Sequence, residues 1–507
     1  MKKIHLFICL LLASTLAAQT SQEAKLPEFQ LQKYEVESAL RFLASDDLQG
    51  RRTGSEGNNI AARFLASQLE ALGYQKAPGL DSYYQSIPFQ KVNPPEAAAL
   101  SIDGQALTFK EDFVVLGGAA TNFEDAKAVF ANYGWVDEAT GQDDYKGLKV
   151  KGKVVFVLSG LPGEFNPQAT FKAMKLKRKI ATENGALALV EIYKLPFPWK
   201  FFTSYFGKSS LQVADANEEG VSTGIPYIWM KEPNETMLEP ITKGKKAKIG
   251  INNNGFATEA ISSQNVIGIL EGSDPELKDE YVLLSAHYDH VGTGKDGGGA
   301  FTAEDSIFNG ARDNAMGVVA LMSAAQSFAQ LRPKRSVIIL AVTGEELGLL
   351  GSSYYASHPL VPLDKTIFNL NSDGAGYNDT SLIVVMGYGR TGIDNLLHQG
   401  IESFGKELVA DPAPEQNLFD RSDNVSFAAK GVPALCFSPG FKTFDEVMMS
   451  RYHQVSDDAD SLDFDYLLKF CQSFAFTARL IANNPQKPIW VEGDKYEAAG
   501  KALYGDK

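Results

Sequence analysis

Several residue types and patterns are scarce in this sequence, and each scarcity excludes a class of protein. The 507 residues include only 3 cysteines and 6 histidines. So few cysteines exclude a disulfide scaffold and a zinc module built on cysteine ligands. No apolar run reaches the roughly 18 residues that a membrane-spanning helix needs, so we expect no stable membrane insertion.

A basic surface is equally scarce. The chain has 48 basic and 62 acidic residues and a net charge of −14. Because nucleic-acid binding requires a basic face that neutralises phosphates, we expect no nucleic-acid partner. A content of 44% hydrophobic and 22% charged residues excludes disorder, collagen and coiled coil. The composition indicates globular domains and leaves the oligomeric state open.

Common catalytic and nucleotide-binding motifs are absent or occur in the wrong context. The sequence has no H-E-x-x-H zinc helix and no G-x-S-x-G serine elbow. Gly292–Gly297 fits G-x-G-x-x-G, but a polar glycine-rich loop follows where a dinucleotide site needs a helix. Gly147–Lys153 fits G-x-x-x-x-G-K, but Val154 replaces the magnesium-binding hydroxyl.

The first 18 residues have the pattern of a cleaved signal peptide. Lys2 and Lys3 precede the apolar run Ile4–Leu12, and small residues follow at 14–18. Cys9 lies inside the apolar run, which argues against a lipid-modified cysteine. We therefore expect a secreted or periplasmic protein that is not a lipoprotein. Cys436 and Cys471 lie in apolar runs and are expected to be buried free thiols.

The order of expected elements predicts two kinds of domain. Residues 97–255 contain short β-rich runs and one helical segment, typical of a small α+β domain. From about residue 262, strands alternate with helices, which predicts an α/β domain with a mostly parallel central sheet and helices on both faces. The expected strands there are 281–286, 336–342, 367–371, 382–386 and 433–437. The expected helices are 317–331, 345–358, 393–404 and 466–482.

Three consecutive strands of this pattern deliver polar side chains at their carboxyl ends. These residues are His287, the pair Glu345 and Glu346, and Asp373. Ligands bind at that edge of an open α/β sheet. Alternation along a strand also places Asp289 on the same face as His287, where it can hydrogen-bond the imidazole.

Two further residues complete a metal-binding set. Asp313 precedes an expected helix, and His453 lies in a polar loop. Imidazole and carboxylate ligands without thiolate suit zinc, with manganese or cobalt as alternatives. One ion rarely takes five protein ligands, whereas two ions that share a bridging carboxylate would use all five. The set is His287, Asp313, Glu346, Asp373 and His453.

The sequence also resembles the co-catalytic zinc peptidases that include aminopeptidase Y, bacterial leucyl aminopeptidases and glutamate carboxypeptidase. The matching segments are 47–55, 287–290, 309–317, 344–352, 371–376, 421–423 and 453–457. Residues 132–134, 152–155 and 184–186 resemble the protease-associated domain that this family often carries. The resemblance implies four parts: a signal peptide (1–18), a discontinuous catalytic domain (27–96 and 256–485), a protease-associated insert (97–255) and a C-terminal tail (486–507).

The resemblance also assigns roles to the site residues. It implies that His287 and Asp373 hold one zinc ion, that Glu346 and His453 hold the other, and that Asp313 bridges them. It implies that Glu345 is the general base and that Asp289 supports His287. A cis peptide bond between Asp313 and Asn314 is expected as well.

The function expected from these features is a di-zinc exopeptidase on peptide substrates, with an aminopeptidase in first place. A carboxypeptidase or dipeptidase is the first alternative, because Arg312 and Arg421 lie beside the site motifs and could bind an α-carboxylate. A single-zinc glutaminyl cyclase and a non-catalytic binding protein are the others. The aromatic segment 195–202 is expected to pack against the catalytic domain or to cover bound peptide.

Overall fold

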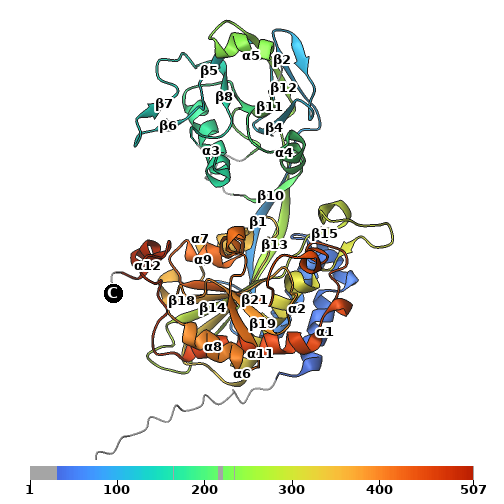
Figure 1. Ribbon diagram of the computed structural model, residues 1–507, viewed down its shortest axis with the longest axis vertical. Coiled ribbons are helices and arrows are strands. Elements are labelled where there is room, and N and C mark those ends of the chain that lie inside the picture. Colours follow the sequence, from blue (N-terminus) through green and yellow to red (C-terminus); the bar gives the residue numbers. More distant parts are fainter. Residues whose placement is uncertain (1–30, 164, 215–220, 233–234, 506–507) are drawn as a thin grey trace, which may run out of the picture.

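The computed structural model describes residues 31–163, 165–214, 221–232 and 235–505. The predicted signal peptide lies outside these residues. The described residues build two large sheets, one in each of two lobes, and long strands run between the lobes (Figure 1). The larger lobe contains the elements expected for the catalytic domain. No helix in the described part of the chain combines the length and the apolar character needed to cross a bilayer.

The larger lobe is built on a nine-stranded mixed sheet. Its strand order is β10-β1-β13-β17-β14-β18-β21-β19-β20. The central strands are parallel, because β14 (Tyr281–His287) pairs in parallel with both β17 (Ser336–Val342) and β18 (Thr366–Ser372), and β18 with β21 (Ala434–Pro439). The remaining strands are β1 (Tyr84–Asn93), β10 (Ser210–Val213), β13 (Ala257–Leu270), β19 (Leu382–Met386) and β20 (Glu407–Ala410).

Helices cover both faces of this sheet (Figure 1). One face packs against α1 (Lys33–Leu43), α2 (Glu56–Ala71), α6 (Met316–Gln330), α8 (Asp394–Glu402) and α11 (Phe464–Asn483) through one apolar core. On the other face lie α7 (Leu350–Ser357) and α9 (Asn424–Ala428). The short helix α10 (Glu446–Met449) precedes the His453 loop, and α12 (Glu497–Tyr504) ends the described chain. The predicted α/β class is therefore confirmed.

The smaller lobe contains an eight-stranded sheet in the order β3-β2-β12-β5-β8-β9-β11-β4. Its strands are β2 (Ala98–Ile102), β3 (Gln105–Leu107), β4 (Phe113–Gly117), β5 (Thr121–Phe130), β8 (Lys153–Leu158), β9 (Ala188–Tyr193), β11 (Tyr227–Lys231) and β12 (Lys248–Asn253). A separate hairpin joins β6 (Val136–Asp137) to β7 (Gln142–Asp143). Three helices belong to this lobe: α3 (Pro167–Glu183), α4 (Trp199–Phe206) and α5 (Glu235–Thr242). Its identity as a protease-associated domain stays a prediction.

Three details differ from expectation. The helix expected from Glu345 begins only at Leu350, because Gly344, Gly348 and Leu349 have positive φ angles and turn the chain first. β10 lies inside the range of the expected insert but pairs with β1 of the larger sheet. The aromatic segment packs within its own lobe: Trp199 and Phe202 contact Tyr193, and the Trp199 indole donates to the Glu111 carbonyl.

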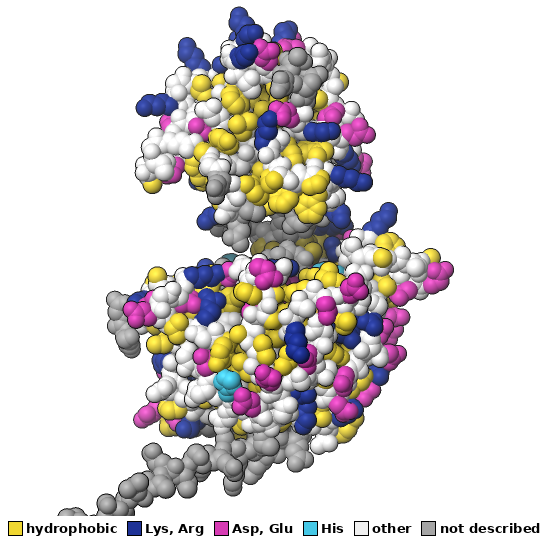
Figure 2. Space-filling view, viewed as in Figure 1, with side chains coloured by type: hydrophobic (Ala, Val, Ile, Leu, Met, Phe, Trp, Pro, Cys, Tyr) yellow, Lys and Arg dark blue, Asp and Glu magenta, His cyan; other side chains and the backbone are white. Residues whose placement is uncertain are grey.

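Charged side chains of both signs are dispersed over the face shown in Figure 2. Lysines and arginines form no continuous patch on that face. Apolar side chains are exposed on the smaller lobe, where the Phe201 side chain is 62% exposed. Cys436 and Cys471 are free and buried, as the sequence indicated.

Candidate metal centre

Three neighbouring parallel strands bring the predicted site residues to one edge of the larger sheet. β14 ends at His287, β18 is followed at once by Asp373, and β17 is followed by Glu345 and Glu346. β14 lies between the other two strands, so their carboxyl ends meet. The side chains at this edge can therefore share ligands.

A first group of metal-binding side chains consists of His287, Asp313 and Asp373. The His287 Nε2 atom lies 3.3 Å from Asp313 Oδ1 and 3.2 Å from Asp373 Oδ1. The Ser422 hydroxyl donates to the other oxygen of Asp373. The Asp373 carboxylate is therefore held with one oxygen directed at His287.

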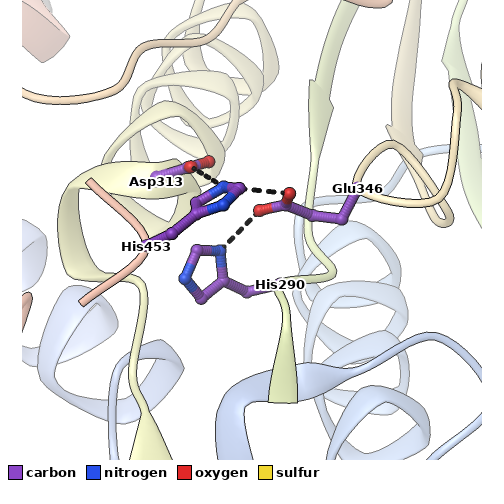
Figure 3. A group of neighbouring side chains, drawn as sticks. All are labelled: His290, Asp313, Glu346 and His453. Atoms are coloured by element: carbon purple, nitrogen blue, oxygen red, sulfur yellow. Dashed lines mark ion pairs between the residues drawn. The ribbon is translucent and has the colours of Figure 1, made fainter. Parts of the chain in front are cut away.

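A second group consists of His290, Asp313, Glu346 and His453 (Figure 3). The His453 Nε2 atom lies 3.2 Å from Asp313 Oδ2 and 3.1 Å from Glu346 Oε2. The His290 Nδ1 atom lies 2.7 Å from Glu346 Oε1. His290 was not predicted as a site residue, although it ends the segment 287–290 on which the resemblance rests.

Asp313 belongs to both groups through different oxygens. Its Oδ1 faces His287 and its Oδ2 faces His453. The peptide bond between Asp313 and Asn314 is cis, as expected. The Asn314 amide donates to the Ser372 carbonyl at 2.9 Å and so ties this segment to the end of β18. This is the arrangement that a bridging carboxylate requires.

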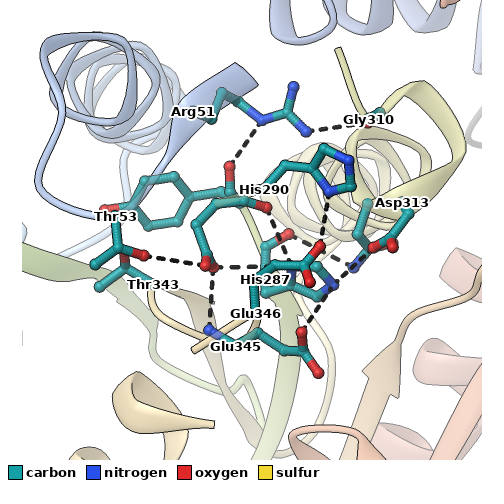
Figure 4. A network of polar contacts seen from close by, with 12 residues as sticks. Arg51, Thr53, His287, His290, Gly310, Asp313, Thr343, Glu345 and Glu346 are labelled. Carbon is teal, nitrogen blue, oxygen red and sulfur yellow. Dashed lines mark hydrogen bonds and ion pairs between the residues drawn. The ribbon is translucent and has the colours of Figure 1, made fainter. Parts of the chain in front are cut away.

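Asp289 supports the site, but by a different contact from the one expected. His287 Nδ1 donates to the backbone carbonyl of Asp289 at 3.2 Å, and the nearest carboxylate oxygen lies 3.8 Å away. The Asp289 carboxylate instead accepts from the Thr53 hydroxyl at 3.0 Å and from the Glu345 backbone N–H at 3.2 Å (Figure 4). Asp289 thus leaves His287 Nε2 free to bind metal and also fixes the backbone of Glu345.

Arg51 holds the backbone beneath the site (Figure 4). Its side chain is fully buried and donates to four backbone carbonyls. These belong to Leu43, Tyr288, Asn309 and Gly310. One guanidinium therefore joins the segment after β14 to the segment before Asp313. Burial lowers the pKa of Arg51 to about 10, which leaves it charged at neutral pH.

A buried ion pair fixes Asp313 to the loop that contains His453. Arg312 Nη1 donates to Asp457 Oδ1 at 2.8 Å, and Asp457 Oδ2 accepts from the Arg312 backbone N–H at 2.9 Å. Arg312 also donates to the Ser461 hydroxyl and carbonyl. Its guanidinium is committed to these contacts, so it does not serve the α-carboxylate role considered from the sequence.

The electrostatics of the site are those of clustered carboxylates. Burial and then the Asp373 and Glu346 carboxylates raise the pKa of Glu345 well above its ordinary value, against the opposing effect of His287. Burial would also raise the pKa of Asp313, but hydrogen bonds from His287 and His453 hold it well below its usual range. Neighbouring acids with pKa values pushed in opposite directions are typical of a catalytic site.

A pocket opens beside the two groups. It combines the site carboxylates and histidines with an apolar wall and with Arg421 and Tyr452. The apolar lining residues are Ala375, Met386, Leu418, Cys436, Phe441 and Phe444. Three tyrosines lie close to the site residues in sequence and could donate to a substrate carbonyl: Tyr288, Tyr377 and Tyr452. Of these, Tyr452 lines the pocket. Tyr288 donates to the Gln264 carbonyl, and the Tyr377 hydroxyl accepts from the Asp463 N–H.

The donor set fits zinc. Each group offers carboxylate and imidazole atoms within 4.8 Å of one another, and no thiolate is among them. Zinc binds such nitrogen and oxygen donors. The charge of the site also favours a cation. Burial of unpaired carboxylates costs free energy, and a bound cation would neutralise them.

This chain is similar to known proteins in part of its sequence and in its fold. Residues 265–477 match the model of peptidase family M28. This segment, less than half of the chain, therefore resembles an M28 peptidase domain. The match confirms the predicted resemblance to a family of peptidases. An aminopeptidase from Aneurinibacillus sp. strain AM-1 shares the fold, with a TM-score of 0.54 and 18% identity over 91% of this chain and 97% of that one.

Curated relatives of the M28 domain are much longer proteins. The vacuolar membrane protease of Saccharomyces cerevisiae S288c is 40% identical over 114 residues, which are 22% of this chain and 10% of that protein. The vacuolar membrane protease of Ajellomyces capsulatus is 27% identical over 280 residues, which are 50% of this chain and 24% of that protein. The matches thus span a tenth to a quarter of these relatives.

These relatives overturn one prediction. The signal-like N-terminus led us to expect a secreted or periplasmic protein. The matching curated proteins are instead named for the vacuolar membrane. The predicted localisation is therefore wrong. An apolar N-terminal run identifies entry into a membrane system more directly than it identifies a final compartment.

Proposed function

We propose that this chain is an aminopeptidase that uses two zinc ions to release N-terminal residues from peptides. The observation that carries the proposal is the position of Asp313, whose two carboxylate oxygens face two different histidines. A carboxylate placed in this way can bridge two ions. A single-zinc cyclase would not need a carboxylate that faces two metal positions.

The proposed ligands divide into two sets that share Asp313. His287 and Asp373 would hold one ion, and Glu346 and His453 the other. When bound, a pair of zinc ions lowers the pKa of a shared water and polarises the scissile carbonyl. The fixed hydrogen bond from His287 Nδ1 to the Asp289 carbonyl keeps the Nε2 atom directed into the site.

Glu345 is the proposed proton carrier. Its carboxylate lines the pocket and lies 3.9 Å from His287 Nε2. Its raised pKa favours uptake of a proton from the attacking water, and the proton then passes to the leaving amine. The hydrogen bond from its backbone N–H to Asp289 fixes the backbone position from which the Glu345 side chain extends.

The pocket supports the choice of an N-terminal residue as the substrate group. A free α-amine is positive, and carboxylates line the pocket. The apolar wall suits an uncharged side chain. Arg421 at the same pocket is the observation that favours the second candidate, a dipeptidase or carboxypeptidase that binds an α-carboxylate.

The test is hydrolysis of amino-acid p-nitroanilides by the purified protein, with and without a zinc chelator. The proposal predicts release that the chelator abolishes and zinc restores. N-acetylated versions of the same substrates are the control and should not be cleaved. Cleavage of dipeptides or of N-blocked peptides, without cleavage of the anilides, would instead support the second candidate. No hydrolysis of either substrate class would contradict both.

A further inference from the structure

We propose that His290 is a fourth protein ligand in the second group, so that the two zinc positions are unequal. The inference rests on the proposed function, because it requires that zinc bind at this site. It assigns four donors to the position of Glu346 and His453, and three to the position of His287 and Asp373. The five ligands predicted from the sequence do not include His290, and they divide equally between the two positions.

The contact between His290 and Glu346 is short, but it is not an aligned hydrogen bond. His290 Nδ1 lies 2.7 Å from Glu346 Oε1. Among the described residues, neither of these two atoms nor His290 Nε2 makes a hydrogen bond. Two polar atoms that approach closely outside hydrogen-bond geometry fit ligands that converge on a cation. Figure 3 shows both side chains directed toward the space that they share with Asp313 and His453.

Burial makes the lack of hydrogen bonds costly. The His290 side chain is fully buried, and unpaired polar atoms in such surroundings carry a desolvation penalty. The second group supplies the remaining partners: His453 Nε2 is 3.1 Å from the other oxygen of Glu346. A bound cation would satisfy His290 and Glu346 together.

The backbone around His290 fixes the ring in this place. Gly310 has a φ angle of 60°, and a Cβ atom there would lie 2.5 Å from two ring carbons of His290. The ring therefore packs directly on the Gly310 backbone. Arg51 holds the same backbone by donating to the Gly310 carbonyl at 3.0 Å. A ring confined in this way is pre-organised as a ligand.

The number of donors predicts how each position behaves. Four protein ligands complete a tetrahedral set, so that the shared water would be a fifth ligand, whereas three leave the fourth position open for water or substrate. The four-donor position should therefore bind zinc more tightly and exchange it more slowly. The three-donor position should lose its ion first when a chelator is added in steps.

The experiment compares the wild-type protein with His290→Gln and with the control His358→Gln, which changes an exposed histidine that belongs to neither metal-binding group. Zinc X-ray absorption counts imidazoles bound to zinc, and stepwise dialysis against a chelator gives the affinity of each ion. We expect three imidazoles per two zinc ions in the wild type and the control, and two in His290→Gln. We also expect the tighter site to lose more than the roughly 10–100-fold in affinity that removal of an outer partner costs.

A positioning role gives a different result. If His290 only holds Glu346 by a hydrogen bond, the wild type will already show two imidazoles per two zinc ions. His290→Asn and His290→Gln will then show the same two, and zinc affinity will fall only modestly. That result would overturn the inference and leave the proposed function intact. A wild-type protein that binds no zinc would overturn both. Circular dichroism of the metal-free variants checks that each has folded.

Discussion

Glu345 is the residue whose proposed role is most specific. It lines the pocket without belonging to either metal-binding group, and burial together with neighbouring carboxylates raises its pKa. The neighbouring Glu346 belongs to the second group instead. We therefore propose separate roles for the two adjacent glutamates: Glu345 transfers a proton and Glu346 binds metal.

Replacing Glu345 by Gln should lower kcat by roughly 100- to 10,000-fold, because the amide cannot accept the proton of the attacking water. Zinc content should remain at the wild-type value. The measurement is kcat on a p-nitroanilide together with zinc analysis of the same sample. Retained turnover with full zinc would remove Glu345 from the mechanism.

Asp423 should make stability depend on pH. Burial raises its pKa to about 7, and neither carboxylate oxygen accepts a hydrogen bond among the described residues. Unfolded Asp423 ionises near pH 4, but the folded protein resists ionisation until about pH 7. The residue therefore costs stability progressively as pH rises from 4 to 7, and the cost is constant above that range.

Asp423→Asn removes this ionisation. Relative to the wild type, the metal-free variant should gain roughly 1–4 kcal/mol of unfolding free energy between pH 4 and pH 8. Urea denaturation at the two pH values measures the difference. An equal difference between variant and wild type at both pH values would show that Asp423 titrates normally.

At the scale of single residues, the sequence predicted five of the six side chains that the structure brings together in the two groups, but not His290. The reason is local geometry. Alternation orients side chains only while the strand continues, and β14 ends at His287. Beyond it the chain turns, so the carbonyl of Asp289 rather than its carboxylate meets His287. No pattern of period two could have placed His290 against Glu346.

At the scale of elements, buried strands were the most predictable part of the fold. Continuous apolar runs gave β17 and β19 with their observed bounds. The start of α7 was predicted too early, since helical periodicity does not reveal a turn at Gly344 and Gly348. The role of the segment Asp46–Arg51 as an anchor could not be predicted, because it depends on hydrogen bonds from Arg51 to carbonyls distant in sequence.

Arg51→Met should destabilise the protein by roughly 2–5 kcal/mol, because it removes the donor shared by four buried carbonyls. Arg52→Met is the matched control. Arg52 is adjacent but its side chain is 32% exposed, and it donates to the Val291 carbonyl. The control should lose less than about 1 kcal/mol. Equal losses in urea denaturation would show that Arg51 has no special role.

At the scale of the whole molecule, a change of sequence pattern predicts two lobes. It does not predict how the two lobes are connected. Pairing of β10 with β1 joins residues from the expected insert to the larger sheet. This contact depends on a separation of more than 100 residues, which local patterns do not encode. The predicted compartment was also wrong, because proteins that match this chain are named for the vacuolar membrane, which the N-terminal pattern does not reveal.

Metal binding should stabilise the whole larger lobe, because the ligands come from segments as distant as His287 and His453. Zinc at about 100 times its dissociation constant adds about 2.7 kcal/mol per site. Chelation should therefore lower Tm by roughly 5–10 °C. Differential scanning calorimetry with and without chelator measures the shift. An unchanged Tm would contradict zinc binding in the folded protein.

The number of zinc ions bound per purified chain tests the central claim most directly. The account predicts two, since the two oxygens of Asp313 face two donor groups. Elemental analysis of protein dialysed against zinc and then against metal-free buffer gives this number. Two ions per chain would support the shared carboxylate and the mechanism built on it. One ion, or none, would contradict the bridging role of Asp313 and with it the proposed function.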